Sequence, residues 1–147
     1  MTSNPIHKPV LGWREWIALP QLGIDRIKAK IDTGARTSAL HAYHVQVREE
    51  DGQRMAHFKV HPVQGNNKIV VKCKAKVKDE RIVTDSGGHK EHRLVIETLL
   101  RIGDHERTVE ITLTDRDNML FRMLLGRTAI RPHFLVDPNK SFLSTAK

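Results

Sequence analysis

Three adjacent residues, Asp32-Thr-Gly, have the types and spacing needed for hydrolytic chemistry. A carboxylate in a tight loop can serve as a general base, and a glycine two residues later lets a second backbone segment approach closely. Hydrolysis of a peptide by carboxylates needs two of them a few ångströms apart, because such a pair shares one proton and divides the acid and base roles. The triplet supplies one member, so the sequence predicts Asp32 as half of a pair.

The residues before the triplet have the pattern of a half-buried strand that would deliver Asp32 to its end. Ile27, Ala29 and Ile31 alternate with charged residues over 26–31. Further strands are predicted over 12–19, 43–48, 69–78, 92–100, 108–114 and 134–136, and a short helix over 126–130 that stops near Pro132. The sequence therefore predicts a mostly β protein.

A glycine-bearing hairpin is predicted between the two best-defined central strands. Residues 71–77 place Val71, Cys73, Ala75 and Val77 on one face and lysines on the other, and Asp85-Ser-Gly-Gly88 follows as the tip. The lysine face should be solvated or lie against an anionic partner. Cys73 should be a small buried residue rather than a nucleophile.

Composition limits the classes of protein that fit. With 147 residues, 39% of them hydrophobic, the chain is long enough for one core and too short for two ordinary domains. A single cysteine excludes an internal disulfide, and there is no long apolar span, so we expect a soluble cytoplasmic protein without a membrane segment. The formal net charge of +8 predicts attraction to anionic partners without choosing among them.

Two segments resemble the hallmarks of the retropepsin-like family of aspartic peptidases. Ala29-Lys-Ile-Asp-Thr-Gly-Ala-Arg-Thr-Ser-Ala-Leu40 is similar to the catalytic loop with its flanking residues, and Met123-Leu-Leu-Gly-Arg127 is similar to the Gly-Arg motif that packs beside that loop. The predicted hairpin stands where the family carries the flap that closes over a peptide. The resemblance covers roughly residues 11 to 136.

The chain is similar in particular to a bacterial subgroup labelled "ATP-dependent zinc protease". Members of that subgroup tend to show Asp-Thr-Gly-Ala-Arg, Ser-Gly-Gly, Asp-Arg-x-x-Met and Leu-Leu-Gly-Arg in this order, and Asp115-Arg-Asp-Asn-Met119 supplies the third here. The label has no support in the residues, because there is no phosphate-binding loop ending in Gly-Lys-Ser/Thr and no His-Glu-x-x-His motif. Some members occur alongside ATP-grasp ligases that add glutamates to protein tails, which implies acidic peptides as substrates.

The resemblance implies an all-β, closed six-stranded-type acid-protease barrel with one short helix, made by residues 11–147 after an N-terminal arm of residues 1–10. It implies a homodimer in which Asp32 of each copy forms the catalytic pair, and no cofactor. The supporting residues would be Thr33, Gly34 and Ala35 in the active-site loop, Ser86, Gly87, Gly88 and Arg36 against the substrate, and Gly126 and Arg127 beneath the loop.

The sequence differs from the viral retropepsins in two places, and these differences limit which properties of the viral enzymes can be expected of this chain. Arg36 stands where those enzymes commonly have the acidic residue that pairs with the arginine of the Gly-Arg motif. Arg127 therefore needs another partner, and an exposed Arg36 near the cleft would favour an acidic substrate. The chain also has an insertion, roughly 44–68, for which the sequence predicts no role.

Other functions fit parts of the sequence. A non-catalytic module that binds acidic peptides or another anion could keep the same barrel and groove. His41, His44, His57 and His61 permit a zinc site and hence a metal-dependent hydrolase, but spacing marks no complete ligand set, so we expect surface histidines and no metal. We do not expect nucleic acid as a partner, because no helix-turn-helix, zinc finger or aromatic platform accompanies the lysines.

Overall fold

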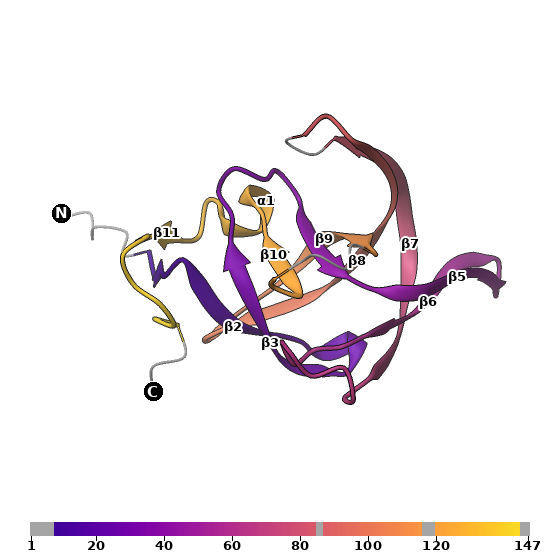
Figure 1. The fold of residues 1–147 in the computed structure, drawn as a ribbon, viewed down its shortest axis with the longest axis horizontal. Helices are drawn as coiled ribbons and strands as arrows, with labels where there is room; N and C mark the ends of the chain where they lie inside the picture. Colours follow the sequence, from indigo (N-terminus) through magenta and orange to yellow (C-terminus); the bar gives the residue numbers. More distant parts are fainter. Residues whose placement is uncertain (1–7, 85–86, 116–119, 145–147) are drawn as a thin grey trace, which may run out of the picture.

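The computed structural model describes residues 8–84, 87–115 and 120–144. Its elements are β1 (Val10–Leu11), β2 (Arg14–Leu19), the 3-10 turn η1 (Pro20–Leu22), β3 (Ile24–Ile31), β4 (Ser38–His41), β5 (Tyr43–Glu50), β6 (Gln53–Val60), β7 (Val71–Thr84), β8 (Lys90–Ile102), β9 (His105–Thr114), β10 (Met123–Leu125), α1 (Arg127–Ile130) and β11 (Leu135–Val136). The described chain is thus mostly sheet with one four-residue helix, and the predicted all-β class is confirmed (Figure 1).

The main sheet has the strand order β2-β3-β10-β4-β9-β8-β7-β6-β5. The short strand β10 lies between β3, which it pairs in parallel, and β4, which it pairs in antiparallel fashion. Strand β2 also pairs with β8 where Ala18 faces Arg101. This arrangement brings together the ends of β3, β4 and β10, three segments that carry the two sequence hallmarks.

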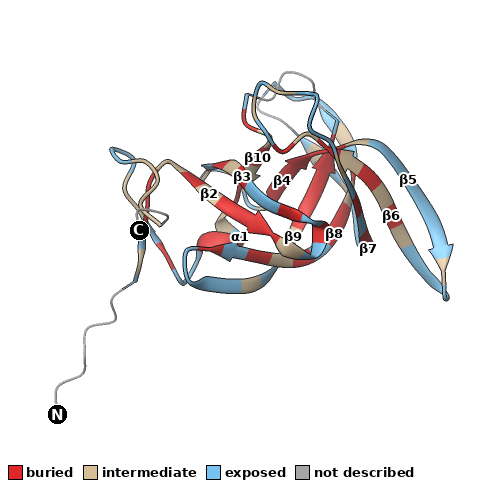
Figure 2. Cartoon of the chain, turned by 90° about the horizontal axis from the view of Figure 1, so that it is seen from below, coloured by how far each residue is buried: buried red, intermediate tan, exposed pale blue. Residues whose placement is uncertain are grey.

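The core is built from branched aliphatic side chains on the central strands, which Figure 2 shows in red. Ile27, Ala29 and Ile31 of β3 are all buried while the residues between them are more exposed, so the predicted alternation of that strand is confirmed. Burial of such side chains supplies most of the favourable free energy of folding. It also holds β3 rigidly, which fixes the position of the residue that follows it.

The insertion of residues 44–68 forms most of a β extension. Strands β5 and β6 pair as a hairpin, and β6 also pairs with β7, which connects the hairpin to the main sheet. Figure 1 shows this hairpin reaching away from the rest of the sheet. On β7, Cys73, Ala75 and Val77 are buried and the lysines between them are exposed, as predicted. Burial raises the pKa of the Cys73 thiol to about 12, which makes it a poor nucleophile.

Three strands, β4, β6 and β10, and one terminal pairing did not follow from the sequence pattern. Strand β4 has all its residues buried, so it shows no alternation, and β6 was hidden inside the insertion. Val10, which we assigned to the N-terminal arm, pairs with Leu135 in a separate two-stranded sheet. Residues 1–7 of that arm lie outside the described part of the chain, and the proposed boundary between arm and domain stays a prediction.

A buried carboxylate holds the C-terminal segment against β2. Glu15 is 0% exposed, and its oxygens accept hydrogen bonds from the backbone N–H groups of Gly12, Leu143 and Ser144 and from the Ser144 hydroxyl. Donors on every side compensate the cost of burying a charge. The two ends of the described chain are therefore tied together through one side chain.

Replacing Glu15 with glutamine should destabilise the protein by about 2–4 kcal/mol, because the amide would turn N–H groups toward backbone donors and leave them unpaired. Chemical denaturation of the purified chain measures this loss. The control is Glu97→Gln, which removes a carboxylate from an exposed pair with Lys78 and should shift the midpoint far less. Equal effects of the two substitutions would contradict the role assigned to Glu15.

Candidate active site

Asp32 lies in a loop at the end of β3 that the backbone holds tightly. Its N–H donates to Leu125 O at 2.9 Å, its carbonyl accepts from Ala35 N at 3.2 Å, and its carboxylate oxygen Oδ1 accepts from Gly34 N at 3.0 Å. A Cβ at Gly34 would lie 3.3 Å from that oxygen. The carboxylate is partly exposed and oriented by its own loop, so it can meet a group that comes from outside the chain.

The Gly-Arg motif packs directly against this loop. Arg127 Nη1 donates to the carbonyls of Thr33 and Gly34, both at 3.1 Å, and Gly126 N donates to the Ser38 hydroxyl at 3.0 Å. The backbone N–H of Arg127 donates to Ala35 O. Arg127 thus has backbone carbonyls as its partners instead of an acidic side chain, which answers the question raised by Arg36. The predicted contact between the two hallmarks is confirmed.

Replacing Gly126 with alanine should destabilise the fold by about 2–4 kcal/mol, because the new Cβ would lie 2.6 Å from the carbonyl carbon of Thr37, which is backbone and cannot move aside cheaply. Thermal unfolding checks the loss. Gly52→Ala is the matched control: its φ is +76° and no atom lies within 4 Å, so only the strain of about 1 kcal/mol should appear. The expectation fails if both variants lose the same stability.

A cleft with a volume of about 580 Å³ opens beside the loop. Its walls come from the loop, β4, β7, β8, β9 and β10, and its lining residues include Ala35, Arg36, Arg81, Ile82, Thr84, Arg93 and Leu124. None of the described lining residues is acidic. Asp32 itself is not among these lining residues, so a single copy of the chain, over its described residues, places no carboxylate in the cleft.

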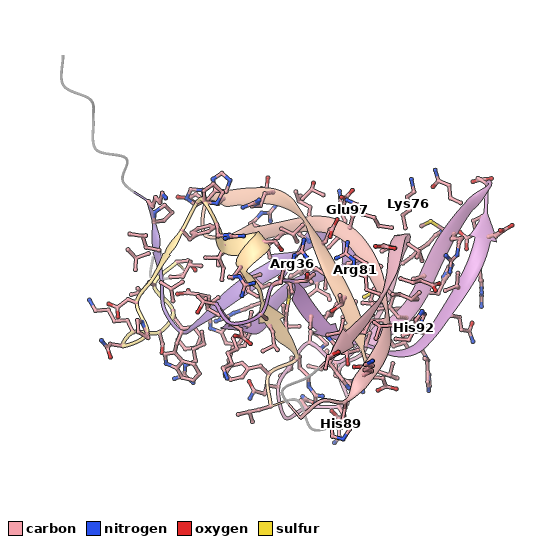
Figure 3. The ribbon with its side chains drawn as sticks, turned by 90° about the horizontal axis from the view of Figure 1, so that it is seen from above. Arg36, Lys76, Arg81, His89, His92 and Glu97 are labelled. Atoms are coloured by element: carbon pink, nitrogen blue, oxygen red, sulfur yellow. The ribbon has the colours of Figure 1, made fainter. Side chains whose placement is uncertain are left out.

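Three arginines give the cleft a positive lining. Arg93 is buried and donates to Glu91 and to the Thr112 hydroxyl, and Arg81 pairs with Asp79 and Glu110. Arg36 is exposed, and no described residue forms an ion pair or hydrogen bond with its side chain. Figure 3 labels Arg36 and Arg81, which line the same cleft from different elements. Arg36 is therefore the cleft arginine available to an anionic ligand.

The predicted flap is the long hairpin of β7 and β8. Ile82, Val83 and Thr84 of β7 line the cleft, so this hairpin forms one of its walls, and its role as a flap stays a prediction. Gly88 lies beyond those residues in a turn with a φ of +84°, which glycine adopts without strain. Ser86 lies outside the described residues, and neither Gly87 nor Gly88 lines the cleft of the single chain.

Sequence reasoning missed Arg81, Arg93 and Thr112 as cleft residues. Arg93 interrupts the apolar positions of its strand, and a buried arginine within a strand is a signal that could have singled it out. The predicted lysine face, by contrast, contributes nothing to the lining of this cleft. Any preference for acidic ligands at Asp32 would therefore come from the arginines.

The four histidines that permit a zinc site are divided between two places. His57 lies in β6 and bonds to Glu50, whereas His41, His44 and His61 line a second cavity together with Asp115. Among the described residues, no group of three or more histidine, cysteine or carboxylate side chains is arranged to hold a metal ion. As for membranes, the described helices are too short to cross a bilayer.

Comparison with known proteins places these features in a family context. Residues 10–147 match the model of a family described as RimB-like, retropepsin-like aspartic endopeptidase RimB. Among curated proteins, the chain is 44% identical over 136 residues to a probable alpha-L-glutamate ligase of Shewanella halifaxensis and 43% identical over 136 residues to one of Desulfotalea psychrophila. Each match covers 92% of this chain but only 30% and 29% of the relative, so the chain spans less than a third of their length.

A solved structure has a similar fold. The crystal structure of a Legionella pneumophila protein of unknown function superposes with a TM-score of 0.76 at 27% sequence identity, covering 93% of this chain and 98% of that one. The likeness extends over nearly the whole of both chains. The arrangement of loop, cleft and hairpin described above thus belongs to a fold that other proteins share.

Proposed function

The chain belongs to the RimB-like family of retropepsin-like aspartic endopeptidases, and from this premise we propose that it hydrolyses peptide bonds with a pair of carboxylates contributed by Asp32 of two copies. The observation that carries the proposal is the loop itself. One oriented, partly exposed carboxylate stands beside a cleft whose described lining holds no second acid. In the proposal, Asp32 of a second copy supplies the other carboxylate of the pair.

In the proposed mechanism the two Asp32 carboxylates share one proton, because like charges so close together cannot both ionise at moderate pH. The ionised member takes a proton from a water molecule that attacks the peptide carbonyl. The protonated member donates to the carbonyl oxygen as negative charge develops there. In each copy, the hydrogen bond from Gly34 N to Asp32 and the hydrogen bond from Arg127 to Thr33 O hold the loop in place. The loop therefore needs little rearrangement during the reaction.

Two features of the fold support this assembly. The pairing of β2 with β8 at Ala18 and Arg101 favours the closed barrel expected for the family. The small sheet of β1 and β11 leaves Val10 40% exposed and Leu135 54% exposed, and among the described strands these two pair only with each other. Apolar residues on unpaired strand edges are suited to joining a second copy.

We further propose acidic, glutamate-containing peptides as substrates. Arg36 lies in the cleft without an acidic partner among the described residues, whereas Arg81 and Arg93 are paired with Glu110 and Glu91. The curated relatives carry the name glutamate ligase, which associates similar chains with proteins that handle glutamate. That name belongs to proteins more than three times as long, and ligase activity is not part of the proposal for this chain.

Dilution provides the test of a shared active site. Peptidase activity per chain should fall as the chain concentration drops below the dissociation constant of the dimer, in parallel with the weight-average mass from sedimentation equilibrium, because a separated copy holds one carboxylate. A panel of acidic peptides serves as substrate. Monomers that retain full activity would refute the shared pair, and a dimer without turnover on any peptide would favour a binding module on the same fold.

A further inference from the structure

A second cavity, of about 420 Å³, lies apart from the Asp32 loop, where β4 runs into β5. Its lining consists of His41, Tyr43, His44, His61, Asn67, Asp115 and Arg122. The volume lies in the range of small-molecule sites, and nearly every lining side chain has a polar group. We call this cavity the histidine cavity. None of its residues has a role in the proposed hydrolysis.

Arg122 is the cation of the histidine cavity, and its charge is not neutralised by a described carboxylate. Its Nη2 donates to Asn67 Oδ1 at 3.0 Å, and its Nη1 lies 3.5 Å from His41 Nδ1. Because a guanidinium only donates, His41 Nδ1 must accept, which leaves the ring proton on Nε2, 3.6 Å from Asp115. The Arg122 Nε–H is buried and has no hydrogen-bond partner within the described part of the chain.

A buried N–H donor without a partner costs about 1–3 kcal/mol relative to a satisfied one. An oxyanion seated against Arg122 would neutralise the guanidinium, and the side chain would have to shift to bring its buried Nε–H to that ligand. Among the described residues of the cavity, the one carboxylate is that of Asp115, which is 62% exposed and lies 3.6 Å from His41 Nε2. Over the described residues, therefore, no carboxylate of the cavity forms an ion pair with Arg122.

The opposite wall of the histidine cavity is an aromatic stack. The rings of Tyr43 and His61 lie 4.6 Å apart at an angle of 24°, and His61 is held by a bond from Nδ1 to Ile69 O. His44 has a φ of +51°, a conformation that costs a non-glycine residue free energy and recurs at binding sites. Tyr43 and His44 pack edge to face. The Tyr43 phenol can donate a hydrogen bond to an anion, whereas the Nδ1–H of His61 is already donated to Ile69 O.

The histidine cavity is separated from the cleft along β4. Ala39 lines the cleft and His41 lines the cavity, so the nearest lining residues of the two sites are two positions apart on β4, or about 7 Å along the strand. We propose that the histidine cavity is a second binding site, which takes the oxyanion of a small ligand, a carboxylate or a phosphate, with Arg122 as its principal contact. The proposal does not depend on peptidase activity.

The test uses the fact that Tyr43 is the only tyrosine of the chain. Labelling the full-length protein with 3-fluorotyrosine gives a single fluorine resonance, and that resonance reports from the wall of the histidine cavity. Inorganic phosphate and glutamate are titrated separately at constant ionic strength. We expect a saturable change of the resonance with a half-point below about 1 mM for at least one of them, and the stronger of the two identifies the source of the oxyanion.

Arg122→Gln should weaken the response to that anion at least tenfold. Arg122→Lys keeps the positive charge but loses the planar arrangement of N–H donors, so it should weaken the response to the anion at least fivefold. This variant tests the contact again in case Arg122→Gln fails to fold. Lys76→Gln is the matched control, because it removes the same charge from an exposed residue of β7 that has no ion pair among the described residues (Figure 3). It should leave the half-point within twofold of wild type.

Three results would overturn the proposal. The first is a wild-type resonance that neither anion saturates. The second is an equal loss in Lys76→Gln and Arg122→Gln, which would mean general attraction to a chain of net charge +8. The third is saturation by Zn²⁺ but by neither anion, which would make the histidines metal ligands. The experiment measures anion binding and not peptide hydrolysis. Its result is therefore independent of whether the peptidase proposal holds.

Discussion

Asp32→Asn should lower the peptidase kcat/KM by about 10³-fold or more while leaving the fold intact. An asparagine pair cannot share a proton or activate water. The amide oxygen can still accept the hydrogen bond from Gly34 N, so the loop should keep its conformation. Kinetics on an acidic peptide and a melting curve of the same sample separate the two effects. Turnover that survives in a folded variant would show that Asp32 is not the catalytic carboxylate.

The Asp32→Asn variant also tests whether the active site needs Asp32 from two copies or is complete within one chain. Excess Asp32→Asn protein, equilibrated with a fixed amount of wild-type protein, should suppress activity, because most wild-type chains would then pair with a chain that lacks the carboxylate. Excess of an unrelated protein of similar charge is the control. Activity that is unaffected by the variant would contradict the two-copy arrangement even if Asp32 is essential.

Arg36→Gln should reduce kcat/KM on glutamate-containing peptides about 10- to 100-fold and have little effect on peptides with glutamine at the same positions. A hydrogen bond between charged groups contributes about 1.5–3 kcal/mol, which corresponds to this range. Arg36 is the best placed of the cleft arginines because Arg81 and Arg93 already bind Glu110 and Glu91. Paired kinetics on the two peptide series give the ratio directly.

Lys76→Gln is the matched control for Arg36→Gln as well, since it removes one positive charge from a residue that does not line the cleft. It should change both peptide series by less than twofold. A similar loss in the two variants would mean that net charge, and not a contact with Arg36, determines the preference. A loss in Arg36→Gln that is equal for both peptide series would instead give Arg36 a structural role.

The sequence alone was enough to predict the strand that leads to the Asp32 loop and the segment that packs against it. The alternation of Ile27, Ala29 and Ile31 is a local property of one strand, so it correctly predicted that β3 ends at Asp32. The Gly126-Arg127 pair was expected beneath the loop on resemblance alone, and the hydrogen bonds of Arg127 to Thr33 and Gly34 confirm the contact. Both predictions depended on residues that are close in sequence or form a recognisable motif.

Other features depended on contacts between residues far apart in the chain. Arg93 enters the cleft because β8 and β9 pair with a register that places it beside Thr112, and no local pattern contains that register. His41, His61 and Arg122 meet at one cavity although they are 20 to 81 positions apart, while His57, only four residues from His61, lies elsewhere. Periodicity within a strand determines which face a side chain takes. Only the pairing of distant strands decides which side chains that face will meet.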